Sequence, residues 1–336
     1  MAVSIPSGVE HPPLLVLLAD GEVHSGEWLA AELSQTRAAV WKGVERLRAM
    51  GIDVQALPRR GYRLAKPVEL LDAGRLRAQL SGESLAHLGA LDLLFEVDST
   101  NSRLLAAAPP PHGVADVCIA ELQHAGRGRL GRRWIAPFGG GLAMSLGWAC
   151  SDVVRTLPAL SLGVGVAVSR ALSRAGAEGI SLKWPNDIWF NDRKLGGVLI
   201  ELRGEAGGAA HVVIGVGVNI SMADEARRQV EASGVQVAAV ADACRQPPSR
   251  NLAAGAILDE LLSMLLQYER FGFAAFRDAW SALDGLNGRP AQVIVGQNSI
   301  LGIARGVDAD GALLLETEDR VQRFVSGEAS LRLTHG

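Results

Sequence analysis

The segment from residue 126 to residue 134 concentrates residues that bind anionic ligands. It reads Gly-Arg-Gly-Arg-Leu-Gly-Arg-Arg-Trp, so three glycines are interleaved with four arginines. Glycine lets the backbone approach a ligand closely, and the arginine guanidinium grips phosphate or carboxylate oxygens with two parallel hydrogen bonds. The chain has no G-x-x-x-x-G-K-[ST] signature, so any nucleotide would be held differently from one in a P-loop protein. Composition alone fits a surface loop or a nucleic-acid patch equally well.

A second cluster lies at residues 183–197, where Lys183-Trp-Pro-Asn-Asp187 is followed by Lys194-Leu-Gly-Gly197. The Trp-Pro pair favours an extended or turned backbone, and Asp187 then stands at the start of the next strand. Lys194 follows after one short hairpin, so we expect Asp187 and Lys194 to meet in one cleft, where the lysine would reach a bound anion. Taken singly, Asp187 is equally typical of a turn, and Lys194 of an edge strand protected against aggregation.

Two weaker polar signals accompany these motifs. Ser99-Thr-Asn101 follows an expected strand at 91–97 and offers donors and acceptors to a polar ligand group, although the same residues make a good helix N-cap. Gly215, Gly217 and Asn219 fall on an expected strand at 212–218, where the glycines leave room for a flat ligand. A lone G-x-G is weak evidence by itself.

The first 66 residues predict a winged helix-turn-helix. After an apolar stretch at 14–18, Ser25 can cap a helix over 26–33, and Thr36 can cap a helix over 37–50. Apolar residues at 40, 44 and 47 form one buried stripe of this third helix, and Gly51 ends it. A hairpin follows at 52–64, with a basic turn at 58–61.

The charge of this region favours DNA. Between residues 36 and 66, eight Lys and Arg stand against two acidic residues, a balance of +6 in a chain whose total is −3. A solvated helix face or a protein-docking module is the alternative. We expect the third helix to enter a major groove and the hairpin to lie beside phosphates, with contacts from Arg37, Lys42, Arg46, Arg59 and Arg60.

The remaining chain predicts a mixed α/β domain and a small β domain. Helices are expected at 70–80, 157–174, 251–268 and 274–283, and further strands at 117–121, 142–148, 180–183 and 198–202. Strands and helices do not alternate strictly, which favours a curled sheet over a doubly wound Rossmann domain. Beyond residue 288, β-type runs at 292–295, 300–307, 312–316 and 321–325 predict a small antiparallel barrel. The expected domains are 1–66, 67–284 and 285–336.

Composition is that of an ordinary soluble globular protein, with 48% hydrophobic and 21% charged residues. Cys118, Cys150 and Cys244 lie far apart without a C-x-x-C pair, which argues against a disulfide framework or a zinc cluster. No signal-peptide pattern opens the sequence, and no apolar run reaches the roughly 18 residues of a membrane span. These features predict a cytoplasmic protein without membrane contact.

Taken together and in this order, the motifs resemble those of the biotin protein ligases. The match spans about residues 90–335, and the winged helix resembles that of the bifunctional members, which also repress the biotin operon. Leu130 departs from the family at the loop tip, where a basic residue is also familiar. Residues 221–248 match only loosely, where an adenine-covering loop would be expected. The resemblance implies a central mixed α+β ligase domain related to class II synthetase-like cores and a C-terminal SH3-like β-barrel.

The resemblance implies a two-step reaction. The biotin carboxylate attacks the α-phosphate of ATP to give biotinyl-5′-AMP and pyrophosphate, and a lysine of the biotin carboxyl carrier protein of acetyl-CoA carboxylase then takes the biotin. Mg²⁺ would enter with ATP rather than through a site made by the protein alone, with Asp187 orienting the ion or a lysine. The implied catalytic residues are Lys194, Asp187 and Arg129. The implied biotin- and adenylate-binding residues are Ser99, Thr100, Asn101, Gln123, Gly126, Arg127, Gly128, Arg129, Trp134, Lys194, Gly197, Gly215, Gly217 and Asn219.

The implied partners are the carrier protein, operator DNA and, once biotinyl-AMP is bound, a second copy of the chain. We expect the 126–133 loop to order over the adenylate, and the strand at 198–202 to pair across a two-fold axis. Two alternatives stay open: a lipoate-type ligase, and a ligand-sensing DNA-binding regulator without ligase activity. The winged helix together with the arginine–glycine loop argues against the first, and intact Asp187 and Lys194 argue against the second.

Overall fold

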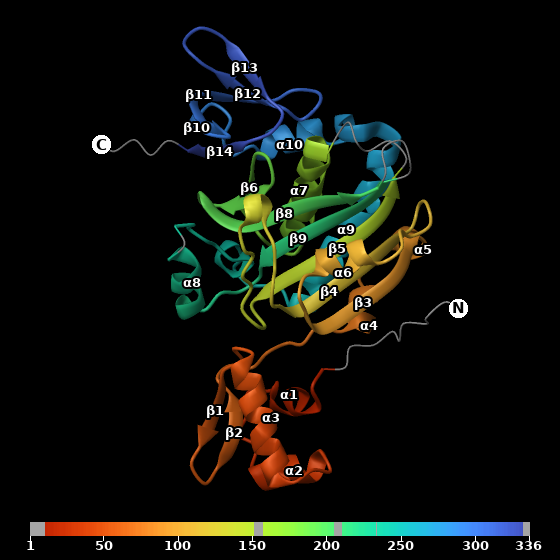
Figure 1. Ribbon diagram of the computed structural model, residues 1–336, viewed down its shortest axis with the longest axis vertical. Coiled ribbons are helices and arrows are strands. Elements are labelled where there is room, and N and C mark those ends of the chain that lie inside the picture. Colours follow the sequence, from red (N-terminus) through yellow and green to blue (C-terminus); the bar gives the residue numbers. More distant parts are fainter. Residues whose placement is uncertain (1–10, 151–156, 205–209, 233, 332–336) are drawn as a thin grey trace.

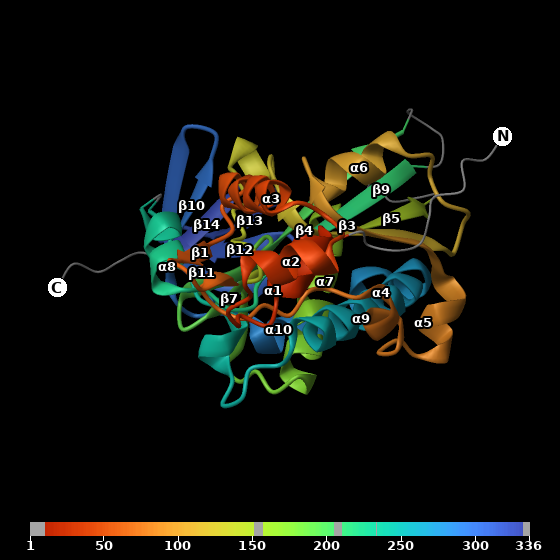
Figure 2. The ribbon, with the colours of Figure 1, turned by 90° about the horizontal axis from the view of Figure 1, so that it is seen from below.

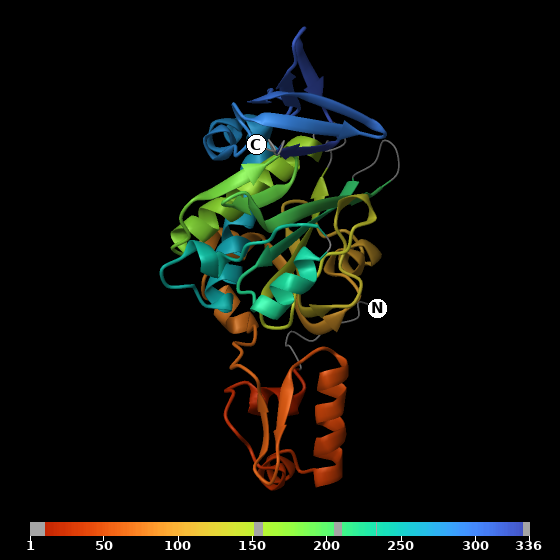
Figure 3. The same ribbon diagram turned by 90° about the vertical axis from the view of Figure 1, so that its left-hand side faces the viewer.

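The computed structural model describes residues 11–150, 157–204, 210–232 and 234–331. Three units follow one another along the long axis of the molecule (Figure 1 and Figure 3). A small helical unit with a hairpin lies at one end, a large central sheet with its helices lies in the middle, and a small β unit lies at the other end. This is the multidomain order that the sequence predicts.

The N-terminal unit is a winged helix-turn-helix. It consists of α1 (Pro13–Leu18), α2 (Gly26–Glu32), α3 (Arg37–Ala49) and the hairpin of β1 (Val54–Leu57) and β2 (Gly61–Leu64). Both predicted caps form, because Ser25 Oγ accepts the N–H of Trp28 and Thr36 Oγ1 accepts that of Ala39. Figure 2 views the molecule from this end. The small core is made of apolar side chains from every helix, among them Leu15, Leu18, Leu29, Val40, Val44 and Leu47.

The central unit is built on a sheet in the order β3-β4-β5-β9-β8-β7-β6. The strands are β3 (Leu88–Val97), β4 (Ala115–Gln123), β5 (Gly141–Cys150), β6 (Ile180–Lys183), β7 (Asp187–Phe190), β8 (Arg193–Arg203) and β9 (Ala210–Asn219). Strands β3 and β4 are parallel, and the other neighbours in this sheet are antiparallel. The mixed topology confirms that this is not a doubly wound Rossmann domain.

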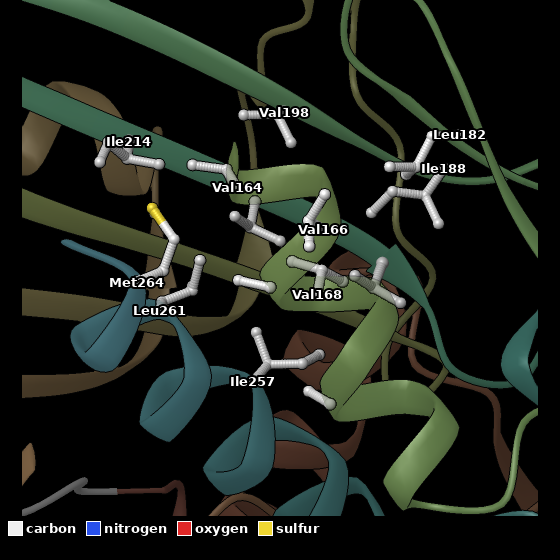
Figure 4. Packing of buried hydrophobic residues seen from close by; sticks show 14 of the residues in the cluster. Val164, Val166, Val168, Leu182, Ile188, Val198, Ile214, Ile257, Leu261 and Met264 are labelled. Atoms are coloured by element: carbon white, nitrogen blue, oxygen red, sulfur yellow. The ribbon is translucent and has the colours of Figure 1, made fainter. Parts of the chain in front are cut away.

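Helices cover the two faces of this sheet unequally. Long helices α7 (Leu157–Arg174) and α9 (Arg250–Phe271) pack on one face, and short α6 (Thr100–Ala106) lies on the other (Figure 1). Figure 4 shows valines of α7 between Ile214 of the sheet and Ile257 of α9, and all of these side chains are at most 1% exposed. This apolar packing holds the sheet in place, so its other face can carry polar side chains.

The C-terminal unit follows α10 (Arg277–Leu283), and Asp284 forms a β-bridge to Leu182 of the central sheet. It is an antiparallel sheet in the order β13-β12-β11-β10-β14. Four strands match the predicted runs: β10 (Pro290–Val295), β11 (Asn298–Val307), β12 (Leu313–Glu316) and β13 (Val321–Phe324). A fifth strand, β14 (Glu328–Leu331), was not expected from the sequence and pairs with β10.

Two predicted helices are shorter than expected. Instead of one helix over 70–80, α4 runs only from Ala73 to Arg77, because Asp72 caps it and the Leu71 N–H donates to Glu121 Oε1 at 2.7 Å. The expected helix at 274–283 starts as a 3₁₀ turn (Gly272–Ala275) before α10. Three further elements were not expected from the sequence: α5 (Gly82–His87), α8 (Asp224–Glu231) and the 3₁₀ turn Val240–Ala243. None of the described helices is both long and apolar enough to cross a membrane.

Candidate active site

A cavity of about 640 Å³ opens on the face of the central sheet that carries α6. Every ligand-site residue expected from the sequence lines it, except Gly126. Gly126 lies behind the wall: its carbonyl accepts the Trp134 N–H at 2.9 Å, and a Cβ atom there would lie 2.6 Å from the Trp134 carbonyl oxygen. The cavity is also lined by Lys183, Asn186 and Arg132, which belong to the two motifs but not to the implied ligand-binding set, and by Met144, Val230 and Glu328, which no motif marked.

Asp187 lies between two lysines at the cavity wall. Lys194 Nζ is 2.6 Å from Asp187 Oδ1, and Lys183 Nζ is 3.5 Å from Oδ2. The β7–β8 hairpin brings the pair together, as the spacing predicts, because Asp187 is opposite Gly197. Burial lowers the pKa of Lys183, an effect that the Asp187 carboxylate opposes, and the ammonium lies 4.7 Å from the centre of the Trp189 ring. Two ammonium groups against one carboxylate leave this wall positively charged, which favours a phosphate.

Arg129 lies where the central and C-terminal units meet. Its guanidinium donates to Asn186 Oδ1 at 3.4 Å and to the Gly327 carbonyl at 3.3 Å. Burial lowers its pKa, and the carboxylate of Glu328 counteracts this. The neighbouring Leu130 has a φ of 55° and a side chain that is 74% exposed, so the loop tip presents an apolar group to solvent.

Two other loop arginines pair with acidic residues from distant segments. Arg127 Nη2 lies 2.8 Å from Glu201 Oε2 on β8, and Arg132 Nη2 lies 2.7 Å from Glu328 Oε2 on β14. Neither Glu201 nor Glu328 was expected from the sequence. No motif marked them, because each meets its arginine only after the chain has folded.

The N-terminal end of α6 forms the polar end of the cavity. Ser99 caps the helix, and the backbone N–H and Oγ1 of Thr100 donate to Gln123 Oε1 at 2.9 and 3.2 Å. Ser145 Oγ on β5 lies 2.6 Å from both Thr100 Oγ1 and Asn101 Oδ1. Ser145 was not expected from the sequence, because its only signal was a hydroxyl inside an otherwise apolar strand.

The glycines of β9 make room for protein side chains at the cavity floor. A Cβ at Gly215 would lie 2.3 Å from Asn101 Oδ1, and one at Gly217 would lie 2.4 Å from the Trp134 ring. Both glycines line the cavity, and the space directly above them is occupied by Asn101 and Trp134. Trp134 Nε1 is buried without a hydrogen-bond partner among the described residues, so it offers a donor to a ligand.

The opposite end of the cavity is formed by the segment after β9. Asn219 Nδ2 donates to the Ala238 carbonyl at 3.0 Å. Lys194 forms backbone hydrogen bonds with the same segment, donating to the Gln236 carbonyl and accepting from the Ala238 N–H. Val230, at the end of α8, also faces the cavity. This wall lies within the 221–248 segment that was expected to cover an adenine.

The described residues do not fit a magnesium ion held by the protein. Among them, no group of three His, Cys, Asp or Glu side chains is placed to hold a metal ion. Both oxygens of Asp187, the carboxylate considered for Mg²⁺ from the sequence, face lysine ammonium groups. A magnesium ion that arrives with ATP would therefore be held by phosphate oxygens.

The basic residues expected to contact DNA lie far from this cavity, on the N-terminal unit. Arg37, Lys42 and Arg46 are exposed on α3, and Arg59 and Arg60 are exposed at the β1–β2 turn. Arg37 is 3.9 Å from Glu27, and Arg46 is 3.8 Å from Glu96 of the central unit. A cation-lined cavity in a central α/β unit, joined to a winged helix-turn-helix, defines a class of protein: a small-molecule-binding domain coupled to a DNA-binding domain.

Comparisons with known proteins identify the family. Residues 97–219 match the biotin/lipoate A/B protein ligase family, residues 288–332 match the biotin protein ligase C terminal domain, and residues 14–63 match an HTH domain. The bifunctional ligase/repressor BirA of Escherichia coli strain K12 is 40% identical over 95% of this chain and 96% of its own length. BirA of Bacillus subtilis strain 168 is 31% identical over 93% of this chain and 95% of its own.

Comparison with solved structures gives the same family. The biotin protein ligase from Aquifex aeolicus in complex with biotin and ATP has a TM-score of 0.61 and is 28% identical, covering 72% of this chain and 98% of that one. The chain therefore belongs to the biotin protein ligase family, and its N-terminal unit places it with the bifunctional ligase/repressors.

Proposed function

We propose that this protein activates biotin with ATP, transfers it to a lysine of a biotin carboxyl carrier protein, and represses transcription through its N-terminal unit. The observation that carries the ligase proposal is the cavity, which gathers Lys194, Lys183, Asp187 and Arg129 opposite the polar end of α6. Its volume of about 640 Å³ lies in the range of small-molecule and cofactor sites. The full-length similarity to BirA supports the same activity.

In the first step the biotin carboxylate attacks the α-phosphorus of ATP, and pyrophosphate leaves. Negative charge accumulates at that phosphorus, so fixed cations lower the barrier. These cations are the side chains of Lys194, Arg127 and Arg129. Asp187 orients the ammonium groups of Lys183 and Lys194. Mg²⁺ bound to ATP supplies further charge neutralisation at the phosphates when present.

The polar end of α6 receives the other end of biotin. The ureido ring and the aliphatic chain of biotin bind to Ser99, Thr100, Asn101 and Gln123. Asn219 lies toward the adenine. The arginine–glycine loop closes over the product and excludes water, which would otherwise hydrolyse the mixed anhydride.

In the second step the neutral amine of the carrier lysine attacks the biotinyl carbonyl, and AMP leaves. An ammonium cannot attack, because its nitrogen has no lone pair. We assign to Asp187 the guidance of the proton that the amine releases.

The test of the ligase is pyrophosphate release from ATP, measured with biotin and then with lipoate, followed by the mass gain of a carrier protein. We expect release with biotin and a carrier that gains one biotinyl group. Faster release with lipoate would make this a lipoate-type ligase. Binding of biotin without release with either acid would make the domain a receptor of a regulator.

Repression would depend on the adenylate. Within the segment 198–202 that was expected to pair across a two-fold axis, residues 199–202 of β8 pair with β9 on one flank, and no described strand pairs with the other flank. We propose that this edge joins two copies once the adenylate has ordered the loop, so that two winged helices meet successive half-sites. Sedimentation and operator binding should then both strengthen with biotin plus ATP, and strengthen less with biotin alone. DNA affinity that does not respond to the adenylate would contradict this coupling.

A further inference from the structure

Glu201 links the N-terminal end of α6 to the arginine–glycine loop. Its Oε2 accepts a hydrogen bond from Asn101 Nδ2 at 2.8 Å and another from Arg127 Nη2 at 2.8 Å. Asn101 stands at the start of α6, where the proposed function places the biotin ring system. Arg127 belongs to the arginine–glycine loop, where it places the phosphate. A single carboxylate oxygen therefore contacts both parts of the site.

Strand β8 fixes Glu201 in this position. Its side chains alternate between the two faces of the sheet, and Leu199, two residues earlier, lines the cavity. Two residues later, the Arg203 guanidinium donates to the carbonyl oxygens of Leu105 and Ala107 at the end of α6. Strand β8 thus contacts α6 at both ends, through Arg203 at one end and through Glu201 and the Leu199 carbonyl at the ligand end.

The two partners of Glu201 differ in their environments. Asn101 is 4% exposed, and its amide nitrogen donates to the Leu199 carbonyl at 3.3 Å and to Glu201. Without an acceptor at position 201, one of these buried donors would lose its partner. The Arg127 side chain is 42% exposed and lines the cavity. A guanidinium has five N–H donors, so Arg127 can keep its bond to Glu201 while it binds a phosphate.

We propose that Glu201 is a positioning residue that holds Arg127 toward the adenylate phosphate and holds Asn101 at the biotin end. This inference rests on the proposed function. Within that function, Glu201 is the carboxylate that orders the phosphate-binding Arg127. If Glu201 instead competed with the phosphate for Arg127, its removal would tighten adenylate binding, so the sign of the effect distinguishes the two roles.

The test compares Glu201→Gln and Glu201→Ala in the full chain. Glutamine keeps an oxygen for Asn101 but removes the charge that holds Arg127. We therefore expect adenylate to dissociate about five- to tenfold faster from Glu201→Gln, the size of a partly exposed charge-assisted pair, with the KM for biotin changed less than about twofold. Alanine also removes the acceptor for Asn101, so Glu201→Ala should raise the KM for biotin as well.

A double-mutant cycle separates positioning from general loosening of the fold. In an Arg127→Gln background, Glu201→Gln should accelerate dissociation by less than about twofold, because the residue it positions is gone. Glu201→Asp, which keeps the charge, should retain adenylate better than Glu201→Gln. Thermal midpoints of all variants are measured alongside. The matched control is Glu316→Gln, which breaks the Arg305–Glu316 pair on the C-terminal sheet and should leave dissociation unchanged.

Equal or slower adenylate dissociation from Glu201→Gln would overturn the inference alone. Additive effects of the Arg127 and Glu201 substitutions would overturn it too, because independent residues cannot position one another. Absence of biotinyl-adenylate in the parent chain would overturn the proposed function, and the inference with it.

Discussion

The cavity of the central unit and the proposed DNA-binding face, made of Arg37, Lys42, Arg46, Arg59 and Arg60, use basic side chains in opposite ways. In the cavity, three of the cations are held by carboxylates: Lys183 and Lys194 lie on either side of Asp187, and Arg127 is paired with Glu201. On the N-terminal unit, the five basic residues expected to contact DNA are exposed to solvent, and the closest carboxylate to Arg46 is Glu96 at 3.8 Å. Among the described residues, Arg59 and Arg60 have no ion-pair partner within 4.0 Å, and the guanidinium of Arg37 approaches Glu27 only to 3.9 Å.

The difference follows from the two ligands. A reacting phosphate must meet cations whose positions are already set, because reorganising them during the reaction would raise the barrier. A DNA backbone presents a long row of phosphates and attracts mobile cations through counterion release, which demands little preorganisation. Substitutions in the cavity should therefore have large effects that change little with salt, and substitutions on the DNA face should have small effects that depend on salt.

The largest effect should come from Lys194→Ala. The variant loses the ammonium that is 2.6 Å from Asp187 in the positively charged wall of the cavity, where we place the reacting phosphate. Pyrophosphate release should therefore fall by about 10²–10³-fold. The thermal midpoint should change little, because the side chain is partly exposed. The matched control is Lys66→Ala, an exposed lysine outside the cavity. Pyrophosphate release equal to the parent would remove Lys194 from the catalytic residues.

Arg129→Gly should affect retention of the product more than its synthesis. The guanidinium lies between the central and C-terminal units and would grip the phosphate after the reaction, so we expect adenylate to escape about 10–100-fold faster. Gel filtration of the enzyme with labelled biotin and ATP measures the adenylate that stays bound. Arg320→Gly, an exposed turn position, is the control. Retention equal to the parent would argue against this role.

On the DNA face, Lys42→Ala and Arg59→Ala should each weaken binding about three- to tenfold at low salt. Each should also lower the slope of log affinity against log salt by about one unit, because one phosphate contact is lost. Fluorescence anisotropy with a duplex selected by the parent protein measures both quantities, and Arg77→Ala is an exposed control on α4. If either variant kept the parent slope, its side chain would not contact a phosphate.

The same contrast decides how much the sequence could predict. The winged helix was predictable because its caps, its apolar stripe and its basic turn are all local signals. Asp187 and Lys194 were predictable because a hairpin separates them by only seven residues. Glu201 and Glu328 were not, because they lie 74 and 196 residues from their arginines, and the surrounding strands carry no motif. Tertiary contacts also set the ends of α4, where Glu121 holds the Leu71 backbone away from the helix.

The smallest effect is expected at Asp284, where burial of a carboxylate changes the free energy of unfolding. Its Oδ1 accepts the Leu286 N–H at 2.9 Å, and its Oδ2 is buried without a partner among the described residues. Burial raises its pKa from 3.8 to about 6. The folded state therefore binds this proton more tightly than the unfolded state. The contribution to stability is complete below about pH 4 and is lost as the pH rises through about 6.

Asp284→Asn keeps an acceptor for Leu286 and removes the charge, so it should be more stable than the parent at pH 7.5. We expect a gain of roughly 1–2 kcal/mol, or a few degrees in Tm, and no gain at pH 4, where the parent carboxyl is protonated. Thermal unfolding of both proteins between pH 4 and pH 8 measures the difference, with exposed Asp319→Asn as the control. A difference in Tm between variant and parent that stayed constant from pH 4 to pH 8 would mean that Asp284 does not titrate in this range. The connection to the C-terminal unit would then accommodate a charge as easily as the proposed DNA-binding face accommodates its arginines.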